Sequence, residues 1–169
     1  MGVFFIADTH FGDKDILRYE NRPFNSVGEM DKVIIDNWNS VISNDDTCFI
    51  VGDYSFYGRN KTIEITKGLN GHKCLILGNH DNENEEFYMD CGFEMVSRYP
   101  IVYDDFWIVS HKPVYINENM PYANIFGHVH KNPIYSDYSS RSFCVCSDRI
   151  NFTPVSFEKI KELVKSMNV

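Results

Sequence analysis

The sequence predicts an α/β protein in which two β-sheets pack against each other. Short apolar runs typical of strands alternate with helical segments through the first half of the chain, which predicts a parallel sheet. The second half contains further short β runs with little helix between them. No Gly-, Ser- or Pro-rich linker separates the halves, so we expect a single domain over residues 1–169.

The composition and the net charge limit the classes of function. An apolar fraction of 43% with 15% aromatic residues excludes a disordered chain. No apolar run approaches the roughly 20 residues that a membrane helix needs, so we expect no membrane partner. The net charge of −8 argues against a long nucleic-acid groove, which needs a basic surface. A small phosphorylated substrate is still compatible, because bound cations can reverse the charge locally.

The cysteines and the N-terminal residues favour a cytoplasmic protein. The chain begins with an apolar run that lacks a basic segment before it and is too short for a signal peptide. Most of the five cysteines lie in apolar, strand-like runs, which is typical of small buried side chains in a reducing compartment. We therefore expect structural thiols at Cys48, Cys74, Cys91, Cys144 and Cys146.

Strands and helices alternate in the first half. The expected strands cover residues 3–7, 47–51 and 73–77, and the expected helices cover 14–20, the segment from 26 to about 43, 61–69 and 83–90. Ser26 and Glu29 have the spacing of a capping box at the start of the longest helix. One face of that helix is apolar. The residues on this face are Met30, Val33, Ile34, Trp38, Val41 and Ile42.

The second half is expected to form the other sheet. Its short β runs cover residues 94–97, 100–103, 106–110, 123–126, 133–135 and 142–147. Asp104 and Asp105 are typical of a hairpin turn between two of these runs. A last helix follows Ser156. Its apolar face consists of Ile160, Leu163, Val164 and Met167.

Side chains that can bind a metal or transfer a proton recur where the apolar strands end. Five strand ends carry His, Asp or Asn, and ligands of α/β proteins bind beyond the carboxyl ends of strands. One histidine at a strand end is ordinary, but five such ends are hard to attribute to chance. Asp-x-His and His-x-His place two side chains on the same side of an extended chain. His72, in an Asn-Gly turn, is expected to be a surface residue. The strand-end residues are Asp8, His10, Asp53, Asn79, His80, His111, His128 and His130.

These motifs resemble the five blocks of the calcineurin-like metallophosphoesterases. The blocks are Asp-x-His, Gly-Asp, Gly-Asn-His-Asp/Glu, His and Gly-His-x-His, and all five occur in this order between residues 8 and 130. Each block alone is weak, but the ordered set is specific. The residues around Asp8, Arg22 and Trp38 further resemble a subgroup of small single-domain bacterial and phage phosphoesterases. The resemblance implies a four-layer α/β/β/α sandwich of two mixed sheets flanked by helices, with a dimetal site at the strand ends.

The resemblance also implies two divalent metal ions. Asp8, His10 and His130 would hold the first ion, Asn79, His111 and His128 the second, and Asp53 would bridge both. An imidazole-rich set with few carboxylates suits Mn, Fe, Ni or Zn, of which we favour Mn. Two dications carry +4 against −2 from two aspartates, so the centre stays positive toward phosphate. A hydroxide between the metals would attack phosphorus in line with the leaving group.

His80 is expected to assist the leaving oxygen rather than to bind metal. The protein Ser/Thr phosphatases of this superfamily orient the equivalent histidine with an Asp three residues after the bridging Asp. That position is Phe56 here, so Asp81, a backbone carbonyl or the substrate must orient His80. Phe56 and its neighbours Tyr54 and Tyr57 could stack on a base, but we expect them to pack in the core.

Two arginines are candidates for binding the substrate. Arg22 and Arg59 lie in expected loops after strands that carry metal ligands, and a guanidinium can hold a phosphoryl oxygen by bidentate hydrogen bonds. A solvated arginine is the competing interpretation for both. Lys112, beside His111, is interpreted as a surface charge.

The leading hypothesis is a metal-dependent phosphoesterase that cleaves a small phosphodiester or a nucleotide-like phosphate. A phosphomonoesterase is the alternative, and a nuclease acting on short oligonucleotides is third. A catalytically weak scaffold on the same fold would be consistent with loss of His80, but this residue is present. A structural zinc module fits poorly, because the candidate ligands are spread along the chain rather than gathered in a compact knuckle. The sequence leaves the oligomeric state open.

Overall fold

Two mixed β-sheets form the centre of the protein. The structure is a computed structural model that describes residues 1–135 and 139–166. The first sheet has the order β4 (Met95–Ser97), β3 (His72–Ile76), β2 (Thr47–Ile50), β1 (Val3–Ile6) and β9 (Val155–Ser156). Strands β1 to β4 are parallel, and β9 is antiparallel to β1.

The second sheet has the order β5 (Ile101–Tyr103), β6 (Trp107–Ser110), β7 (Ala123–Phe126) and β8 (Ser142–Cys144). Its strands are parallel except for the hairpin of β5 and β6. In that hairpin Asp104 and Asp105 both have positive φ, and Phe106 N donates to Tyr103 O. This is the hairpin turn that the sequence predicted.

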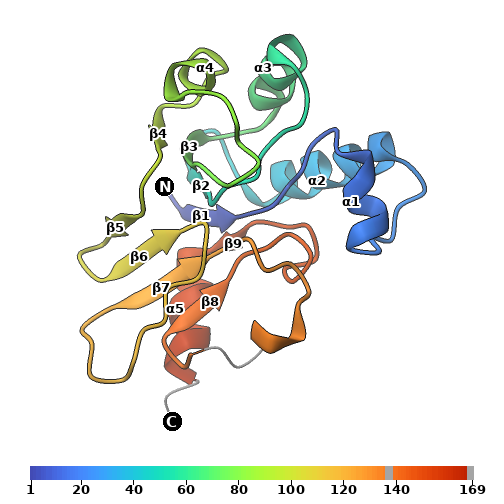
Figure 1. The fold of residues 1–169 in the computed structure, drawn as a ribbon. Coiled ribbons are helices and arrows are strands. Elements are labelled where there is room, and N and C mark those ends of the chain that lie inside the picture. The colour runs from blue at the N-terminus through green and yellow to red at the C-terminus, as the bar shows by residue number, and fades with distance from the viewer. Residues whose placement is uncertain (136–138, 167–169) are drawn as a thin grey trace.

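The helices lie on the outside of the sheets (Figure 1). Their bounds are α1 (Lys14–Tyr19), α2 (Val27–Val41), α3 (Arg59–Gly68), α4 (Glu85–Asp90) and α5 (Phe157–Ser166). Helices α1 to α4 lie on the face of the first sheet that points away from the second sheet, and α5 contacts β1, β8 and β9. The α/β sandwich of two mixed sheets flanked by helices is thus confirmed.

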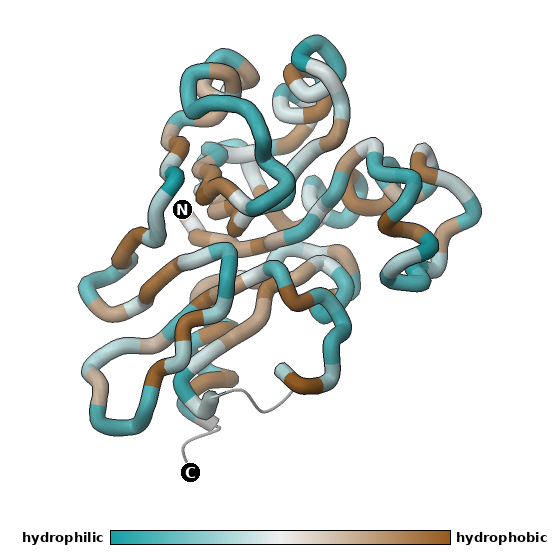
Figure 2. Tube along the Cα trace, in the orientation of Figure 1, coloured by the Kyte–Doolittle hydropathy of each residue, from teal (hydrophilic) through white to brown (hydrophobic). Residues whose placement is uncertain are grey.

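Alternating strand residues form two hydrophobic clusters. Ile6, Ile50 and Leu75 face the cluster under α2, α3 and α4. Phe5 and Phe49 face the second sheet and α5, where Phe5 stacks on Phe49 with ring centroids 5.2 Å apart. In Figure 2 the strands are mostly hydrophobic, whereas hydrophilic residues concentrate in loops and on helices. Both faces of β1 to β3 are therefore covered, as expected for parallel strands.

The predicted apolar face of α2 needs one correction. Met30, Ile34 and Trp38 are fully buried, but Val41 is 38% exposed. Ile42, just after the helix, is buried instead. The helix ends at Val41, and the extended backbone of Ile42 turns its side chain into the core.

The predicted capping box at the start of α2 is also only partly present. Ser26 Oγ accepts from Glu29 N at 3.2 Å, as the motif requires. The Glu29 carboxylate accepts from Asn25 N at 2.8 Å rather than from Ser26 N. It thereby holds the residue that precedes the cap.

Of the strands predicted in the second half, one was wrong and another was too long. Residues 133–135 form a 3-10 turn, in which Pro133 offers no N–H to a neighbouring strand and Tyr135 N donates to Asn132 O. The run 142–147 is assigned as a strand only to Cys144. Val145 N still donates to Phe126 O of β7, but Val145 O and Ser147 N bond to Ala7 of the first sheet. Met167, predicted on the face of the last helix, lies outside the described residues.

None of the described helices has both the length and the apolar character required to cross a membrane. All five cysteines are free thiols.

The exposed position of Val41 on α2 can be tested by comparing two side-chain substitutions. We expect Ile34→Ala to lower the free energy of unfolding by about 2–5 kcal/mol, because it leaves a cavity in the core. Val41→Ala, on the same helix but exposed, should change it by less than about 0.5 kcal/mol. Urea denaturation of both variants measures the difference. Equal losses would contradict the placement of Val41.

Candidate metal centre

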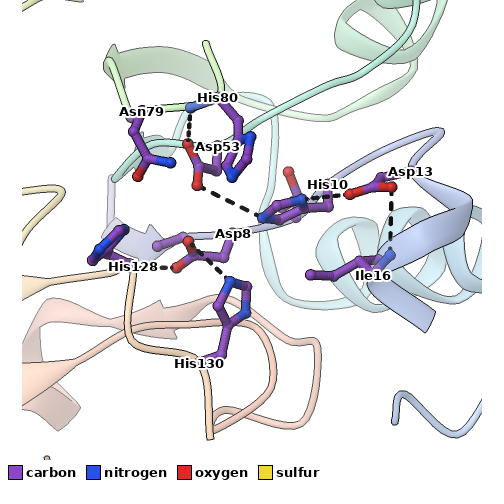
Figure 3. Close-up of polar contacts among 12 residues, drawn as sticks. Asp8, His10, Asp13, Ile16, Asp53, Asn79, His80, His128 and His130 are labelled. Atoms are coloured by element: carbon purple, nitrogen blue, oxygen red, sulfur yellow. Dashed lines mark hydrogen bonds and ion pairs between the residues drawn. The ribbon is translucent and has the colours of Figure 1, made fainter. Parts of the chain in front are cut away.

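The carboxyl ends of five strands meet at one place between the sheets. Segments after β1, β2 and β3 of the first sheet and after β6 and β7 of the second sheet surround it (Figures 1 and 3). The sheets are joined there: Ala7 N donates to Val145 O, and Ser147 N donates to Ala7 O, both at 2.8 Å. Residues far apart in the sequence therefore converge on a common centre.

Two groups of potential ligand atoms lie side by side in this centre. Asp8, His10 and His130 form one group, and Asp53, His111 and His128 form the other. Within each group, one ligand atom per residue lies within 4.8 Å of the others.

Asp53 lies between the two groups. Its Oδ2 is 3.7 Å from His10 Nε2 and 3.4 Å from His111 Nε2. Asn79 Oδ1 lies 3.0 Å from His111 Nε2, which adds the amide to the second group. The structure thus brings together all seven residues that the sequence analysis assigned as ligands, and Asp53 occupies the position of a bridge. Their ligand roles stay a prediction.

The backbone at this centre adopts a conformation that is unfavourable for residues with a Cβ. Left-handed φ values between 46° and 72° occur at five of the seven residues: Asp8, His10, Asp53, His128 and His130. Such conformations are uncommon outside glycine and gather at functional sites. Local propensity does not favour them, so the tertiary structure must hold them in place.

Glycines before the candidate ligands allow the close approach of strand ends, between the sheets at Gly127 and within the first sheet at Gly78. A Cβ at Gly127 would lie 2.6 Å from Ala7 Cβ and 2.8 Å from Asp8 Oδ2. A Cβ at Gly78 would lie 2.1 Å from Asp53 Oδ1. Any side chain at these positions would push the strand ends, and with them the carboxylates, apart.

Three histidines are oriented through Nδ1. His10 Nδ1 pairs with Asp13 Oδ2 at 3.0 Å, and His130 Nδ1 pairs with Asp148 Oδ2 at 2.8 Å. His111 Nδ1 lies 2.9 Å from the carbonyl oxygen of Val51. When such a ring is neutral with its proton on Nδ1, the lone pair is on Nε2, and Nε2 of all three residues faces the centre.

The charges of the centre are coupled. Burial disfavours the charged form of Asp53, but the hydrogen bond and charge of His111, with the N–H of His80, hold the pKa of Asp53 at about 2. Burial likewise opposes a charged His111, yet the carboxylates of Asp53 and Asp8 raise its pKa to about 9. Asp53 therefore carries negative charge at neutral pH and attracts positive charge to this place.

Two buried polar atoms without hydrogen-bond partners indicate what kind of ligand the centre fits. Over residues 1–135 and 139–166, the buried side-chain nitrogen and oxygen atoms without a hydrogen-bond partner are Asp8 Oδ1 and His10 Nε2. Buried polar atoms are rarely left unpaired, because the loss of hydration is costly. Both atoms carry lone pairs that point into the first group, and a bound cation would satisfy both. The donor set thus fits a divalent metal ion.

His80 lies at the exposed edge of the centre. Its backbone N–H donates to Asp53 Oδ1 at 2.8 Å, and its ring lies 5.6 Å from the ring of His10 (Figure 3). Phe56 stacks on His10 at 5.2 Å and lies 5.4 Å from the His80 ring. Phe56 is 45% exposed, so the expected core position was wrong. Ring contacts with Phe56 and His10 therefore hold His80.

Asp81, one of the groups considered for orienting His80, has a different role. Its Oδ2 accepts from Asp53 N and Gly78 N, both at 2.8 Å, and its Oδ1 accepts from Tyr54 N at 3.0 Å. These bonds tie the segment after β2 to the segment after β3. Asp81 thus positions Asp53 instead of the His80 ring.

Arg22 does not have the geometry of a substrate clamp. Its Nε and Nη2 donate to the carboxylate of Asp148 at 3.0 and 2.9 Å, and its remaining donors reach the carbonyl oxygens of Asp8 and Thr9. The guanidinium is completely buried. Arg22 fastens the backbone of Asp8 and Thr9 to Asp148 and has no donors left for a phosphate.

Arg59 also has partners elsewhere. It begins α3, pairs with Asp90 Oδ2 at 2.7 Å and lies over the ring of Phe87. The contact holds α3 to α4, and Arg59 is not among the residues that surround the centre. The proximity in sequence to Asp53 was therefore misleading.

Asp13 and Asp148 orient two of the histidines and were not predicted from the sequence. Asp148 had a detectable signal, because it follows the last β run in the same way as the other strand-end residues. Asp13 also caps α1 by accepting from Asp15 N, so its local pattern indicated only a helix start.

Metal binding should stabilise the protein through the first group. A divalent ion such as Mn²⁺ at a hundred times its Kd is expected to add about 2.7 kcal/mol to the free energy of unfolding, and a chelator should remove this gain. His10→Ala should lose most of the gain, whereas His72→Ala, at an exposed pair with Glu94, should keep it. Thermal melting with and without metal measures both. An equal gain in the two variants would contradict the assignment.

Asp148 should affect metal affinity without being a ligand. Asp148→Asn weakens the hold on His130 Nδ1, and such changes typically cost roughly 10- to 100-fold in metal affinity. Asp90→Asn is the matched control, since Asp90 also pairs with an arginine but is exposed. Isothermal calorimetry compares the two. A weaker affinity in the control than in Asp148→Asn would refute the role of Asp148.

Comparison with known proteins shows that the chain has relatives. No family model matches the chain. The uncharacterized protein MJ1445 of Methanocaldococcus jannaschii is 32% identical over 181 residues, which cover 99% of this chain and 93% of that protein. The gene 66 protein of Mycobacterium phage L5 is 36% identical over 82 residues, 47% of this chain and 39% of that protein.

Two solved structures share the fold. The protein of unknown function AQ665 from Aquifex aeolicus superposes with a TM-score of 0.76 at 24% identity, covering 96% of this chain and 98% of that one. The nuclease MPE of Pseudomonas putida superposes with a TM-score of 0.50 at 21% identity, covering 76% of this chain and 61% of that one. Because the identity with MJ1445 extends over nearly the full length of both proteins, this chain belongs to the same family as MJ1445.

Proposed function

We propose that this protein is a metal-dependent phosphoesterase that hydrolyses a small phosphodiester or a nucleotide-like phosphate. The observation that carries the proposal is the pair of adjacent ligand groups, in which Asp53 of the second group also lies 3.7 Å from His10 of the first. The ordered motifs that resemble calcineurin-like metallophosphoesterases support it. The fold shared with a protein named as a nuclease, which cleaves phosphoester bonds, also supports it.

The seven candidate ligands would bind two divalent ions, three residues to each ion and Asp53 to both. Asp8, His10 and His130 would hold one divalent ion, and Asn79, His111 and His128 the other, with Asp53 reaching both. Bound ions of this kind polarise a phosphoryl oxygen and supply a nucleophile at neutral pH. Since Asn79 is neutral, only two aspartates offset the charge of two dications, which leaves the centre attractive to a phosphate. Among Mn, Fe, Ni and Zn, we favour Mn.

His80 is the residue that we assign to the leaving group. In the hydrolysis a water oxygen bonds to phosphorus, the bond from phosphorus to the ester oxygen breaks, and the ester oxygen takes up a proton. His80 lies at the exposed edge of the centre, beside His10 and outside both ligand groups. From there it can donate the proton as the leaving alkoxide forms. Phe56 limits the directions in which the ring can turn.

The structure weakens one argument for the alternative, a phosphomonoesterase. A monoester carries more negative charge than a diester, and the two arginines considered for binding it are paired elsewhere. A nuclease acting on short oligonucleotides is the second candidate, and the fold of the Pseudomonas putida nuclease favours it.

The proposal is tested with aryl phosphates and metal-loaded protein. We expect bis(p-nitrophenyl) phosphate to be hydrolysed with a higher kcat/KM than p-nitrophenyl phosphate. His80→Ala should lower kcat by about 100-fold or more, the usual contribution of a general acid. Asp53→Ala should lower both kcat and metal affinity.

His72→Ala is the control for the loss of a histidine, because His72 lies on β3 away from the centre. Its rates should equal those of the unmodified protein. Unchanged rates in both His80→Ala and Asp53→Ala would overturn the proposed function.

A further inference from the structure

A cleft of about 390 Å³ opens beside the second ligand group. His111 and Asn79 form part of its wall, and Arg98 and Lys112 line it as well. Pro100 and Val114 contribute apolar surface. A molecule bound at the centre through a phosphate can therefore extend into this cleft.

Arg98 and Lys112, the two cationic side chains of the cleft, lie just after strand ends, as the candidate ligands do. Arg98 follows β4 and Lys112 follows His111 at the end of β6. Strand β4 lies next to β3 in the first sheet, whereas β6 belongs to the second. The cleft thus has one cation from each sheet, on strand ends that face the same side as the centre.

Neither cation has a strong internal partner. The nearest carboxylate recorded for Arg98 is that of Glu85, 4.0 Å from Nε, and both side chains are about half exposed. Within residues 1–135 and 139–166, the ammonium group of Lys112 has no hydrogen bond or ion pair. This contrasts with Arg22 and Arg59, whose guanidinium groups are engaged by Asp148 and Asp90. Arg98 and Lys112 have donors available for a ligand.

The charge of this cleft also differs from that of two other clefts. The cleft beside His128 and His130 combines Lys131 with Glu20. The cleft between α2 and α3 combines Lys32 and Lys61 with Asp31 and Glu64. Among residues 1–135 and 139–166, no carboxylate lines the cleft of Arg98 and Lys112. In a protein with a net charge of −8, a cleft lined by two cations and no acid is suited to an anion.

We propose that Arg98 and Lys112 form a subsite for a second phosphate group of the substrate. The inference rests on the proposed function, because it places the scissile phosphate at the centre. The substrate class is then a nucleotide or short nucleotide ester that carries a second phosphate beyond the scissile one. Pro100 and Val114 offer apolar contact to the sugar or base between the phosphates.

The first test measures binding, so it does not depend on turnover. Thymidine 3′,5′-bisphosphate and thymidine 5′-monophosphate are titrated into metal-loaded protein by calorimetry. We expect the bisphosphate to bind roughly tenfold more tightly, equivalent to about 1.4 kcal/mol. Arg98→Gln and Lys112→Gln should each reduce this ratio, and the double variant should bring it close to one.

Lys131→Gln is the matched control, because Lys131 follows His130 as Lys112 follows His111 but lines the cleft that contains Glu20. It should leave the ratio of affinities unchanged. A ratio near one in the unmodified protein, or an unchanged ratio in the double variant, would overturn the subsite. Loss of the ratio in Lys131→Gln alone would also overturn it and would place the second phosphate on the other side of the centre.

A kinetic test separates the subsite from the proposed function. The p-nitrophenyl ester of thymidine 5′-phosphate is compared with the same ester carrying a 3′-phosphate, either terminal or linked to another nucleoside. A gain in kcat/KM with the terminal phosphate identifies a nucleotide end, and a gain with the linked one identifies an oligonucleotide. Binding that depends on Arg98 and Lys112 without any turnover would refute the proposed function and retain the subsite.

Discussion

The close contact between the carboxyl end of β1 and the strand ends of the second sheet is the constraint on which the centre depends. Ala7 exchanges hydrogen bonds with Val145 and Ser147, and Gly127 packs against Ala7 with no space for a side chain. Asp8 follows directly, and its Oδ2 accepts from His128 N. The same contact therefore joins the two sheets and places a carboxylate from one sheet beside histidines from the other.

Around this contact, buried polar groups hold the candidate ligands rather than the substrate. Arg22 binds the carbonyl oxygens of Asp8 and Thr9, and its partner Asp148 orients His130. Asp81 holds the backbone of Asp53 in the same manner. Burial of a charged group is costly unless the group is paired or hydrogen-bonded. Arg22 and Asp148 form an ion pair, and Asp81 accepts three backbone hydrogen bonds. Their hydrogen bonds offset the unfavourable left-handed backbone at Asp8 and Asp53.

The two sides of the centre serve different purposes under the proposed function. His80 lies at an edge of the centre beside the rings of Phe56 and His10, and within the described residues no acidic side chain bonds to the His80 ring. Arg98 and Lys112 line a cleft with Asn79 and His111. Within the part of the chain that the structure describes, Lys112 has no ion pair and Arg98 has only a 4.0 Å contact with Glu85. A substrate with two phosphates would then have one phosphate at the metal centre and the other beside Arg98 and Lys112. His80, at the edge, would protonate the leaving oxygen. The difference arises because the fold buries Arg22 with Asp148 and leaves Arg98 about half exposed.

The sequence by itself determined the α/β class, most strands and the set of residues at the centre. Apolar periodicity marks buried strands, and parallel strands must end on the same side, so strand-end residues such as Asp8, Asp53 and His111 were predictable. Val41 and residues 133–135 were misassigned, because local patterns do not show where a helix ends or whether a strand finds a partner. The roles of Arg22, Asp148 and Phe56 were decided only by the tertiary structure. Each depends on a neighbour distant in the chain: Arg22 and Asp148 are 126 residues apart yet share two hydrogen bonds. Sequence patterns report local periodicity, whereas the partner of a charged group is chosen by the packing of the whole chain.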